Sequence, residues 1–289
     1  MHLVMIGGSD AGISAALRVR ELDPRAEVTV VLEDAYPNFS ICGIPYYVSG
    51  EVTHWRNLAH RTVADLEATG MRLRLDTIAR RIDVPGRKLL VTSSTGGEEV
   101  LGYEKLVVGT GAVPVRPPIA GLAGPGALGP GDGVHLLHSM GDTFAVMRTL
   151  EQASPASAVI VGAGYIGLEM ADALTVRGLA VTQIEQLSEV LPTVDPELGA
   201  LVHAELASHG VRVLTATTVQ AVTRAVPGQA GHLEVRAIAV DPGMRTNLPD
   251  VFAAGDCVIT HHRLLGETYL PLGTTAHKQG RVAGENALG

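Results

Sequence analysis

The sequence predicts an α/β protein built from two Rossmann-like dinucleotide-binding domains, the second inserted into the first. Two glycine-rich turns, at residues 7–12 and 162–167, each follow a short apolar run and precede a segment with helical apolar spacing. Each helix-like segment is followed by a second apolar run that ends in an acidic residue. Gly, Ala and Val are abundant and aromatic residues are only 3% of the chain, which is typical of tightly packed strand–helix units.

The length, net charge and cysteine content of the chain exclude several classes of protein. A chain of 289 residues fits two domains, and a net charge of −8 argues against a nucleic-acid partner. The start, "MHLVMIGGSD", lacks the basic segment of a signal peptide, and no apolar run approaches membrane-spanning length. Cys42 and Cys257 lie far apart and form no metal-type pattern. We therefore expect a cytoplasmic protein without a metal site, a membrane partner or a disulfide framework.

The first glycine turn begins a βαβ unit. The apolar run His2–Ile6 is expected to be a strand buried on both faces, and residues 13–22 have helical spacing. Ser9 replaces the middle glycine of the usual fingerprint. Glu33 ends the next apolar run at the distance that a ribose-binding carboxylate needs. The glycines let backbone N–H groups approach a pyrophosphate at the helix N-terminus.

The second turn, "GAGYIG" at residues 162–167, is a complete fingerprint. It follows the apolar run 158–161, and "LAVTQIE" places Glu185 at the end of the next strand. A carboxylate there accepts hydrogen bonds from the ribose hydroxyls of NAD, and "EQLSE" offers no arginine for a 2′-phosphate, so NADH is favoured over NADPH. Two dinucleotide folds imply two dinucleotides, most simply a flavin and a nicotinamide.

Three further stretches extend the pattern: "EKLVVGTGAVP", "TNLPDVFAAGDC" and "YLPLGTTAHKQGRVAGENAL". Together with the two turns and "FSICGIPYY", they resemble the pyridine nucleotide–disulfide oxidoreductase family of FAD flavoproteins over nearly the whole chain. The likeness is greatest to the single-cysteine branch of coenzyme A-disulfide reductases, NADH oxidases and NADH peroxidases.

The resemblance implies roles for the matching residues. The first turn and Glu33 would hold FAD, Asp256 would bind its ribityl or pyrophosphate part, and the helix near Thr274 would direct its N-terminus at the flavin. The second turn and Glu185 would hold NAD(P)H. The predicted cofactor-binding residues are Gly7, Ser9, Asp10, Ala11, Gly12, Glu33, Thr110, Gly111, Ala112, Gly162, Gly164, Tyr165, Ile166, Gly167, Glu185, Gly255, Asp256, Thr274 and Thr275.

Three residues are the predicted catalytic set: Cys42, Tyr165 and Glu169. Tyr165 resembles the gate that covers the flavin until nicotinamide displaces it; the alternative is a tyrosine at a domain seam. Glu169 is expected to orient nicotinamide, and the alternative is a surface or paired carboxylate.

Cys42 has no second cysteine within a helical turn, so its redox chemistry requires a mixed disulfide or a sulfenic acid. It is expected to open a short helix with Pro45 in the first turn, a position that lowers a thiol pKa. The alternative is an inert buried cysteine.

Asp10 lies at the position where peroxidase- and oxidase-type members of the family usually carry histidine. An ionised aspartate cannot donate a hydrogen bond to a peroxide or sulfenate oxygen, so Asp10 favours a disulfide as the acceptor. Asn38 and Ile41 depart from the serine and asparagine of coenzyme A-disulfide reductases. Three hypotheses follow: a reductase of disulfides such as coenzyme A disulfide, an NADH oxidase reducing oxygen through a sulfenic acid, or a non-catalytic flavin-binding or redox-sensing fragment.

The expected domains are 1–119 and 238–289 for FAD and 120–237 for NAD. Between Ala237 and Ile238 the sequence skips several dozen residues of the family pattern, so we expect a truncated NAD domain, unless residues were lost from the sequence at this point. The resemblance implies an interface domain after Gly289 that forms a homodimer in full-length members of the family, and we expect this chain to be without it.

Overall fold

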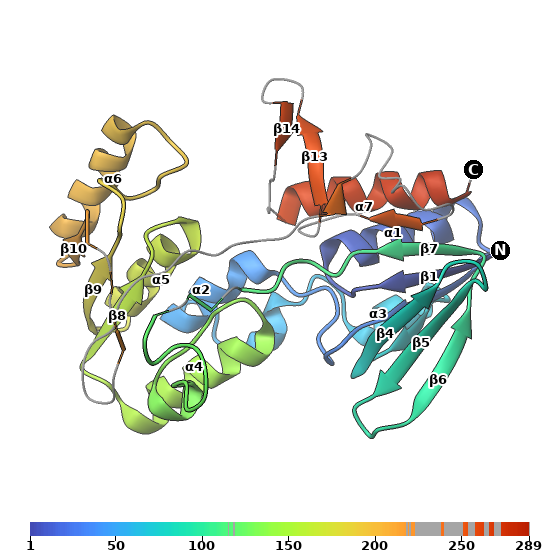
Figure 1. Ribbon diagram of the computed structural model, residues 1–289, viewed down its shortest axis with the longest axis horizontal. Helices are drawn as coiled ribbons and strands as arrows, with labels where there is room; N and C mark the ends of the chain where they lie inside the picture. The colour runs from blue at the N-terminus through green and yellow to red at the C-terminus, as the bar shows by residue number, and fades with distance from the viewer. Residues whose placement is uncertain are drawn as a thin grey trace. The chain divides into compact units, whose positions relative to one another are not determined.

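The chain divides into two compact units. The computed structural model describes residues 1–114, 116–117, 119–217, 219, 221–222, 238–239, 251–253, 258–262, 266–268 and 273–288. The first unit comprises Met1–Ser40, Ala59–Ala112 and Arg236–Gly289, and the second comprises Ile41–Leu58 and Val113–Val235. Both units contain parallel sheets with connecting helices, which confirms the predicted α/β fold class (Figure 1). Residues 41–58 group with the second unit, which the sequence does not predict.

The first unit is organised around a five-stranded sheet in the order β12-β7-β1-β2-β3, in which every pair is parallel. Two smaller sheets, β4-β5-β6 and β11-β13-β14, complete its strands. Its elements are β1 (His2–Ile6), α1 (Asp10–Leu22), β2 (Glu27–Val31), α3 (Val63–Ala68), β3 (Arg72–Arg74), β4 (Thr77–Asp83), β5 (Lys88–Ser93), β6 (Glu98–Gly102), β7 (Lys105–Val108), β11 (Ile238–Ala239), β12 (Val251–Ala253), β13 (Val258–His262), β14 (Gly266–Thr268) and α7 (Gly273–Leu288).

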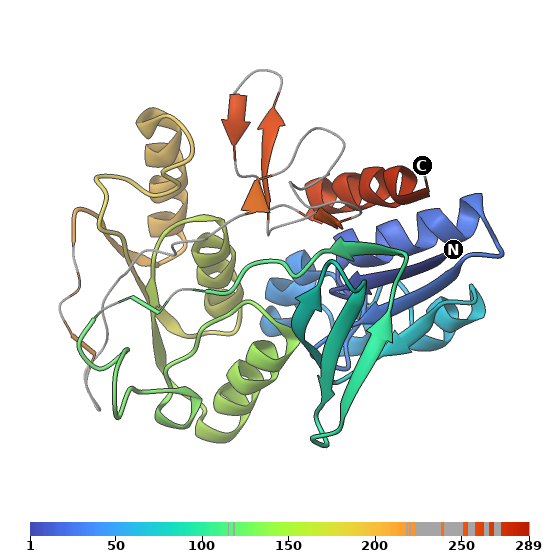
Figure 2. The ribbon, with the colours of Figure 1, turned by 45° about the vertical axis from the view of Figure 1, so that its right-hand side comes forward.

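Alternation along β1 explains the layers of this unit. Leu3 and Met5 pack in the same cluster as α1 and the last turns of α7, whereas Val4 and Ile6 pack against apolar side chains of β5 and β6. The central sheet is therefore covered by helices on one face and by β4–β6 on the other (Figure 2). A strand covered on both faces reads as a continuous apolar run, as the sequence of β1 does.

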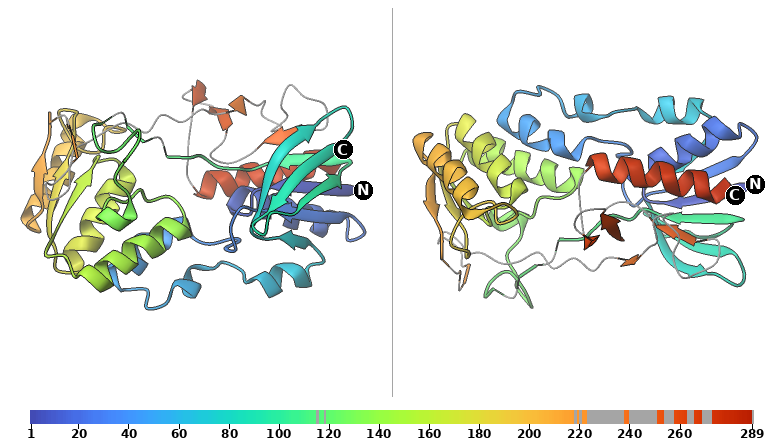
Figure 3. Two further views of the ribbon diagram at one scale, coloured as in Figure 1. Left: turned by 60° about the horizontal axis from the view of Figure 1, so that its bottom comes forward. Right: turned by 90° about the horizontal axis from the view of Figure 1, so that it is seen from above.

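Close contact of α1 and α7 depends on two glycines. A Cβ at Gly280 would lie 2.0 Å from the Ala11 carbonyl oxygen, and one at Gly284 would lie 2.5 Å from that of Ala15. The two helices therefore run side by side (Figure 3). At the rim the Arg18 guanidinium donates to Glu285 at 2.7 Å.

The second unit has a three-stranded parallel sheet in the order β10-β9-β8, with α5 packed against β8 and β9. An apolar cluster that includes Ile119, Leu128 and Ile184 joins the 119–128 connection to this sheet. Its elements are α2 (Ile44–Ser49), α4 (Met140–Ala153), β8 (Ser157–Val161), α5 (Tyr165–Val176), β9 (Ala180–Ile184), α6 (Pro196–Ser208) and β10 (Arg212–Leu214), with short 3₁₀ turns at Ile41–Gly43, Trp55–Leu58 and Pro130–Asp132.

The two ends of the segment 41–58 are neighbours, because Phe39 and Ala59, which flank the segment in the first unit, form an antiparallel bridge. Within the second unit this segment is held by α2, which packs against α5 and α4. The Arg177 guanidinium, at the end of α5, donates to the backbone carbonyl of Val48. Trp55 also contacts the ring of Phe144 on α4 edge-on, with ring centroids 5.3 Å apart.

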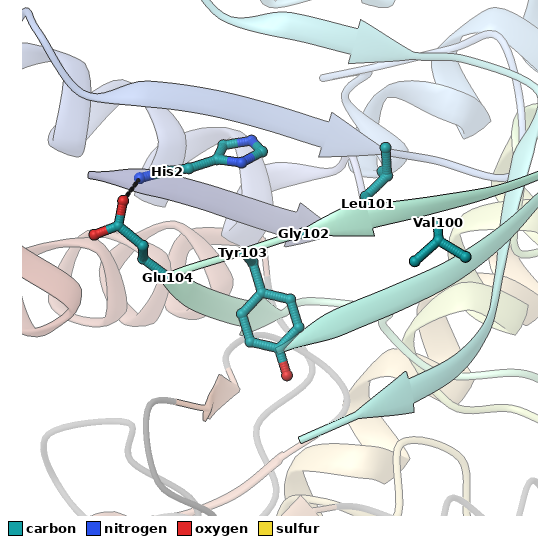
Figure 4. A pocket seen from close by; sticks show the side chains of 6 residues that line it. All are labelled: His2, Val100, Leu101, Gly102, Tyr103 and Glu104. Atoms are coloured by element: carbon teal, nitrogen blue, oxygen red, sulfur yellow. Dashed lines mark hydrogen bonds between the residues drawn. The ribbon is translucent and has the colours of Figure 1, made fainter. Parts of the chain in front are cut away.

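A hollow of about 420 Å³ lies in the first unit between His2 and Val100–Glu104 (Figure 4). The His2 backbone N–H donates to the Glu104 carboxylate there, at 3.0 Å. This hollow is at the beginning of β1, whereas the first glycine turn follows its end, so the hollow is not the predicted dinucleotide site. Within the described ranges, no helix is both long and apolar enough to cross a membrane.

We expect Gly280→Ala to destabilise the protein by about 1–3 kcal/mol, because its Cβ would overlap the Ala11 carbonyl and force α7 away from α1. Gly141→Ala, on α4, is the matched control. The nearest neighbour of its Cβ lies 3.6 Å away, so helix propensity should make it neutral or slightly stabilising. Urea unfolding of the three proteins measures the difference; equal stabilities would contradict the close α1–α7 contact.

Candidate functional site

The first glycine turn is a tightly packed corner between β1 and α1. Gly7 has φ +110°, and its added Cβ would lie 2.0 Å from the Gly109 carbonyl oxygen. A Cβ at Gly12 would lie 1.9 Å from the Gly7 carbonyl oxygen, so α1 can start at the strand end only without a side chain there. Ser9 precedes the helix in an extended conformation, and its side chain does not cap the N–H groups of α1. These N–H groups, with Asp10 and Ala11 in the first turn, form a site suited to a phosphate.

The structure brings residues 109–112 to this turn. β7 pairs with β1, and the Gly109 N–H donates to the Ile6 carbonyl at 2.7 Å. Thr110, Gly111 and Ala112 follow at once, and Gly111 has φ +67°. Residues about a hundred positions apart in the sequence therefore meet at the carboxyl ends of neighbouring strands, where α/β sheets bind ligands.

Asn38 ties the chain before Cys42 to the first turn. It is buried, with φ +56°, a left-handed conformation that asparagine tolerates well. Its backbone N–H donates to the Gly8 carbonyl at 2.8 Å, and its side-chain amide donates to the Asp10 carboxylate at 3.4 Å. The Arg61 guanidinium donates to the Asn38 side-chain oxygen at 3.3 Å. Asn38 thus fixes the carboxylate that stands at the start of α1.

The second glycine turn repeats this corner. Gly162 has φ +97°, and a Cβ at Gly167 would lie 2.0 Å from the Gly162 carbonyl oxygen. Gly164 precedes α5 in an extended conformation, and nothing lies within 4 Å of where its Cβ would be. This leaves room for a ligand to approach the backbone at the start of α5, where Tyr165 and Ile166 are exposed.

The acidic residues predicted beside the two turns lie in different environments. Glu185 is buried, and its carboxylate accepts the Ala163 N–H at 2.8 Å and the Leu187 N–H at 2.9 Å. Glu33 is exposed. Its neighbour Asp34 has a raised pKa, mainly because of burial and further because the carboxylates of Asp76 and Glu33 are near. Ribose binding by Glu33 or Glu185 remains a prediction.

Cys42 is exposed and lies in the 3₁₀ turn Ile41–Gly43, which runs directly into α2. Pro45 occupies the first turn of α2, as expected, and is buried with Ile44 and Val48. The thiol is therefore accessible, and the buried packing role considered for it does not describe this conformation. Because α2 rests on α5, the cysteine segment is attached to the helix that follows the second glycine turn.

Tyr165 and Glu169 are one helical turn apart on α5. Tyr165 is 53% exposed at the start of the helix. Glu169 borders a small hollow of about 50 Å³ between α5 and α2, lined from α2 by Pro45, Tyr46 and Ser49. Partial burial there raises the pKa of the Glu169 carboxyl. The three predicted catalytic residues thus belong to the second unit, Tyr165 and Glu169 on α5 and Cys42 in the turn that leads into α2.

No contact described above involves four of the predicted cofactor-binding residues, Gly255, Asp256, Thr274 and Thr275. Gly255 and Asp256 lie outside the described residues, as does Cys257. Thr274 and Thr275 lie in the first turn of α7. The residue Ala237 before the expected break is also outside the described ranges, and Ile238 begins β11.

Sequence reasoning missed two residues that support the site. Gln183 is fully buried in β9, and its amide donates to the Gly162 carbonyl at 3.1 Å beneath the second turn. The sequence feature that could have indicated Gln183 is a polar residue inside the apolar run "AVTQI". Arg177 fixes α2 to α5, and no local pattern marks it because its partner Val48 is more than a hundred residues away.

Known proteins resemble this chain over its whole length. The family model described as pyridine nucleotide-disulphide oxidoreductase matches residues 1–232. An NADH oxidase of Methanocaldococcus jannaschii is 28% identical, over all of this chain and 70% of its own length. An NAD(P)H coenzyme A polysulfide/persulfide reductase of Pyrococcus horikoshii is 28% identical, over 99% of this chain and 69% of its own length. The solved structure of an NAD-dependent persulfide reductase from A. fulgidus is 33% identical with a TM-score of 0.91.

This chain is shorter than these proteins in two respects. It covers only 59% of the A. fulgidus chain, although all of this chain is matched. The alignment with the M. jannaschii protein runs over 322 positions, more than the 289 residues present here, so that relative carries residues inside the aligned region that have no counterpart in this chain.

We expect Asn38→Asp to destabilise the protein by about 1–2 kcal/mol near pH 7, because two carboxylates would face each other where an amide now donates to Asp10. Arg61 offsets only part of this repulsion because it is exposed. The loss should shrink near pH 4, where one carboxyl becomes protonated. Denaturant unfolding at both pH values measures it. Asn57→Asp, at an exposed position, is the control, and an equal effect there would contradict the Asn38–Asp10 contact.

The raised pKa of Glu169 predicts a pH-dependent effect of Glu169→Gln. The folded protein disfavours the ionised form of Glu169, so ionisation of this carboxyl destabilises the fold. This destabilisation is absent below the pKa of Glu169 in the unfolded chain. It grows as the pH rises from that pKa to the higher pKa in the folded protein. The variant should therefore gain stability over the wild type between about pH 4 and pH 7, by less than about 1 kcal/mol because water still screens the charge. Asp172→Asn on the same helix is the control. A gain in stability that is larger at pH 4 than at pH 7 would contradict a raised pKa of Glu169.

Proposed function

Because this chain belongs to the pyridine nucleotide-disulphide oxidoreductase family, we propose that it passes electrons from NAD(P)H through FAD to Cys42 and on to a disulfide such as coenzyme A disulfide. The observation that carries this proposal is the exposed Cys42 thiol on a segment that packs, through α2, against α5, the helix that follows a complete dinucleotide turn. The sequence has no second cysteine near it, so the electrons must leave through a bond to the substrate.

The two glycine turns are the proposed dinucleotide sites. The first would hold FAD, because it lies in the unit to which the predicted Asp256 motif and α7 also belong. The second would hold NADH, with Glu185 near the ribose and Tyr165 and Glu169 near the nicotinamide. At both sites a glycine turn leads directly into a helix of at least 12 residues, and the N-terminus of such a helix suits a pyrophosphate. When bound, FAD would accept two electrons as hydride from NADH and pass them to a sulfur acceptor.

Cys42 would alternate between a mixed disulfide and a thiolate. In the first half-reaction, two electrons and one proton cleave the bond between Cys42 sulfur and the substrate sulfur, which releases one thiol and leaves the Cys42 thiolate. In the second, the Cys42 thiolate attacks a new disulfide, forms a new mixed disulfide and expels the second half as a thiolate. The balance is NADH, one proton and one disulfide giving NAD⁺ and two thiols.

The charge at position 10 supports a disulfide over a peroxide or oxygen acceptor. Asp10 occupies the position at which the peroxidase- and oxidase-type members carry histidine, and Asn38 holds its carboxylate in place. An ionised aspartate cannot donate a hydrogen bond to a sulfenate oxygen, whereas a histidine can. The names of the relatives leave an NADH oxidase as the second candidate. A coenzyme A-linked sulfur compound is the acceptor class that the Pyrococcus relative suggests.

Anaerobic NADH titration of the flavin-loaded protein tests this proposal. For wild type we expect flavin bleaching together with release of about one small thiol for each Cys42 mixed disulfide, counted with a thiol reagent and identified by mass spectrometry. Cys42→Ser should still bleach but release none. A sample incubated without NADH controls for spontaneous thiol loss.

Other outcomes separate the alternatives. Flavin bleaching with oxygen uptake on aeration, and no thiol release, would replace the proposal with an oxidase. Absence of bleaching at any NADH concentration would identify a non-catalytic flavin-binding protein, which is the result expected if the second unit is truncated as predicted and does not position NADH.

A further inference from the structure

The two glycine turns can be matched residue by residue through their backbone hydrogen bonds. The Gly7 N–H donates to the Val31 carbonyl at 2.8 Å, and the Gly162 N–H donates to the Ile184 carbonyl at 2.9 Å. The strand pairs agree, since Ile6 is paired with Val31 and Val161 with Ile184. Val31 and Ile184 are therefore equivalent positions at the ends of β2 and β9.

The residue that follows each of these positions is also equivalent. The Leu32 N–H donates to the Arg74 carbonyl at 3.0 Å, and the Leu32 carbonyl accepts the Thr77 N–H at 2.8 Å. In the second unit the Glu185 N–H donates to the Leu214 carbonyl at 2.8 Å, and the Glu185 carbonyl accepts the Thr217 N–H at 3.0 Å. The counterpart of Glu185 is thus Leu32. Glu33 comes one residue later.

Side-chain environments show the same equivalence. Leu32 is 5% exposed, and its Cδ1 would lie 2.6 Å from a Cβ placed on Gly8. Glu185 is 6% exposed, and its carboxylate accepts the N–H of Ala163, which follows Gly162 as Gly8 follows Gly7. The space beneath the first turn is filled by hydrocarbon, and the same space beneath the second turn holds a carboxylate.

This difference bears on how a dinucleotide is held. A carboxylate at the end of the second strand is the group that accepts hydrogen bonds from the adenosine ribose. The Glu185 carboxylate uses one lone pair on each oxygen for a backbone N–H, so each oxygen retains one for a ribose hydroxyl. Leu32 has no such acceptor. Leu32 is buried whereas Glu33 is exposed, so Glu33 does not take over the position of Leu32.

We propose that the first turn binds the adenosine ribose of its flavin without a side-chain carboxylate, because Leu32 occupies the position at which Glu185 lies in the second unit. Flavin binding is then weaker than a carboxylate at position 32 would make it, and it is insensitive to the charge of Glu33. This inference rests on the proposed function for the choice of FAD as ligand, whereas the equivalence of Leu32 and Glu185 does not.

Equilibrium binding of FAD to the apoprotein tests the inference without turnover. We expect Glu33→Gln to change the FAD dissociation constant less than about threefold, and Leu32→Glu to lower it about tenfold through charge-assisted hydrogen bonds to the ribose. Leu32→Met, which conserves volume, is the matched control and should bind as the wild type does. Flavin fluorescence quenching gives the constants, and circular dichroism reports whether each variant is folded.

The outcomes are distinct. Tighter binding by Leu32→Glu with unchanged binding by Glu33→Gln supports the inference. Weakening of tenfold or more by Glu33→Gln overturns it, because Glu33 would then be the ribose acceptor, and this holds even if Leu32→Glu fails to fold. Folded Leu32→Glu that binds no tighter than Leu32→Met also overturns it. No FAD binding by any of the four proteins would overturn the proposed function as well, whereas binding that fails to respond as stated overturns this inference alone.

Discussion

Both units depend on one steric contact, in which the carbonyl oxygen of the first glycine in a turn occupies the space where the last glycine would carry a side chain. The distances from an added Cβ are 1.9 Å for Gly12 and 2.0 Å for Gly167, so no other residue type fits without displacing the backbone. The contact lets α1 and α5 start where β1 and β8 end. The direction of α1 then determines where α7 packs, and that of α5 determines where α2 rests. The absence of a side chain at Gly12 and Gly167 therefore determines where the candidate phosphate sites and the cysteine segment lie.

The two candidate phosphate sites differ in the acidic residues of the helix that follows each turn, although their backbones match. The first turn of α5 contains no acidic residue, whereas α1 carries Asp10 in its first turn. An aspartate there is favourable for the helix dipole, but it opposes a phosphate at the same helix end. Asn38 holds that carboxylate through its side-chain amide. A phosphate at the proposed first site would therefore share its helix end with the Asp10 side chain, whereas the carboxylate near the proposed second site is that of Glu185, which already accepts two backbone N–H groups.

Local patterns in the sequence were sufficient for the fold class, the two glycine turns and the strands on either side of each turn (β1, β2, β8 and β9), because periodicity and glycine spacing act over a few residues. They could not distinguish Glu33 from Glu185, since the one-residue difference is fixed by pairing with the strands that end at Arg74 and Leu214. Nor could they assign 41–58 to the second unit, because that depends on contacts of α2 with α5 and of Trp55 with Phe144, which lie about ninety residues or more away along the chain. Gln183 and Asn38 were visible as polar exceptions, but only the fold shows what they hold.

The bridge between Phe39 and Ala59 makes the cysteine segment a closed excursion from the first unit. Its two ends are neighbours, so the chain between them can change in length or composition at little cost to the central sheet beyond that of closing a loop. If Cys42 reacts with the acceptor as proposed, the acceptor chemistry lies on a short replaceable segment, separate from the glycine turns that are the proposed dinucleotide sites. A scaffold of this kind can acquire a new electron acceptor by exchanging fewer than twenty consecutive residues.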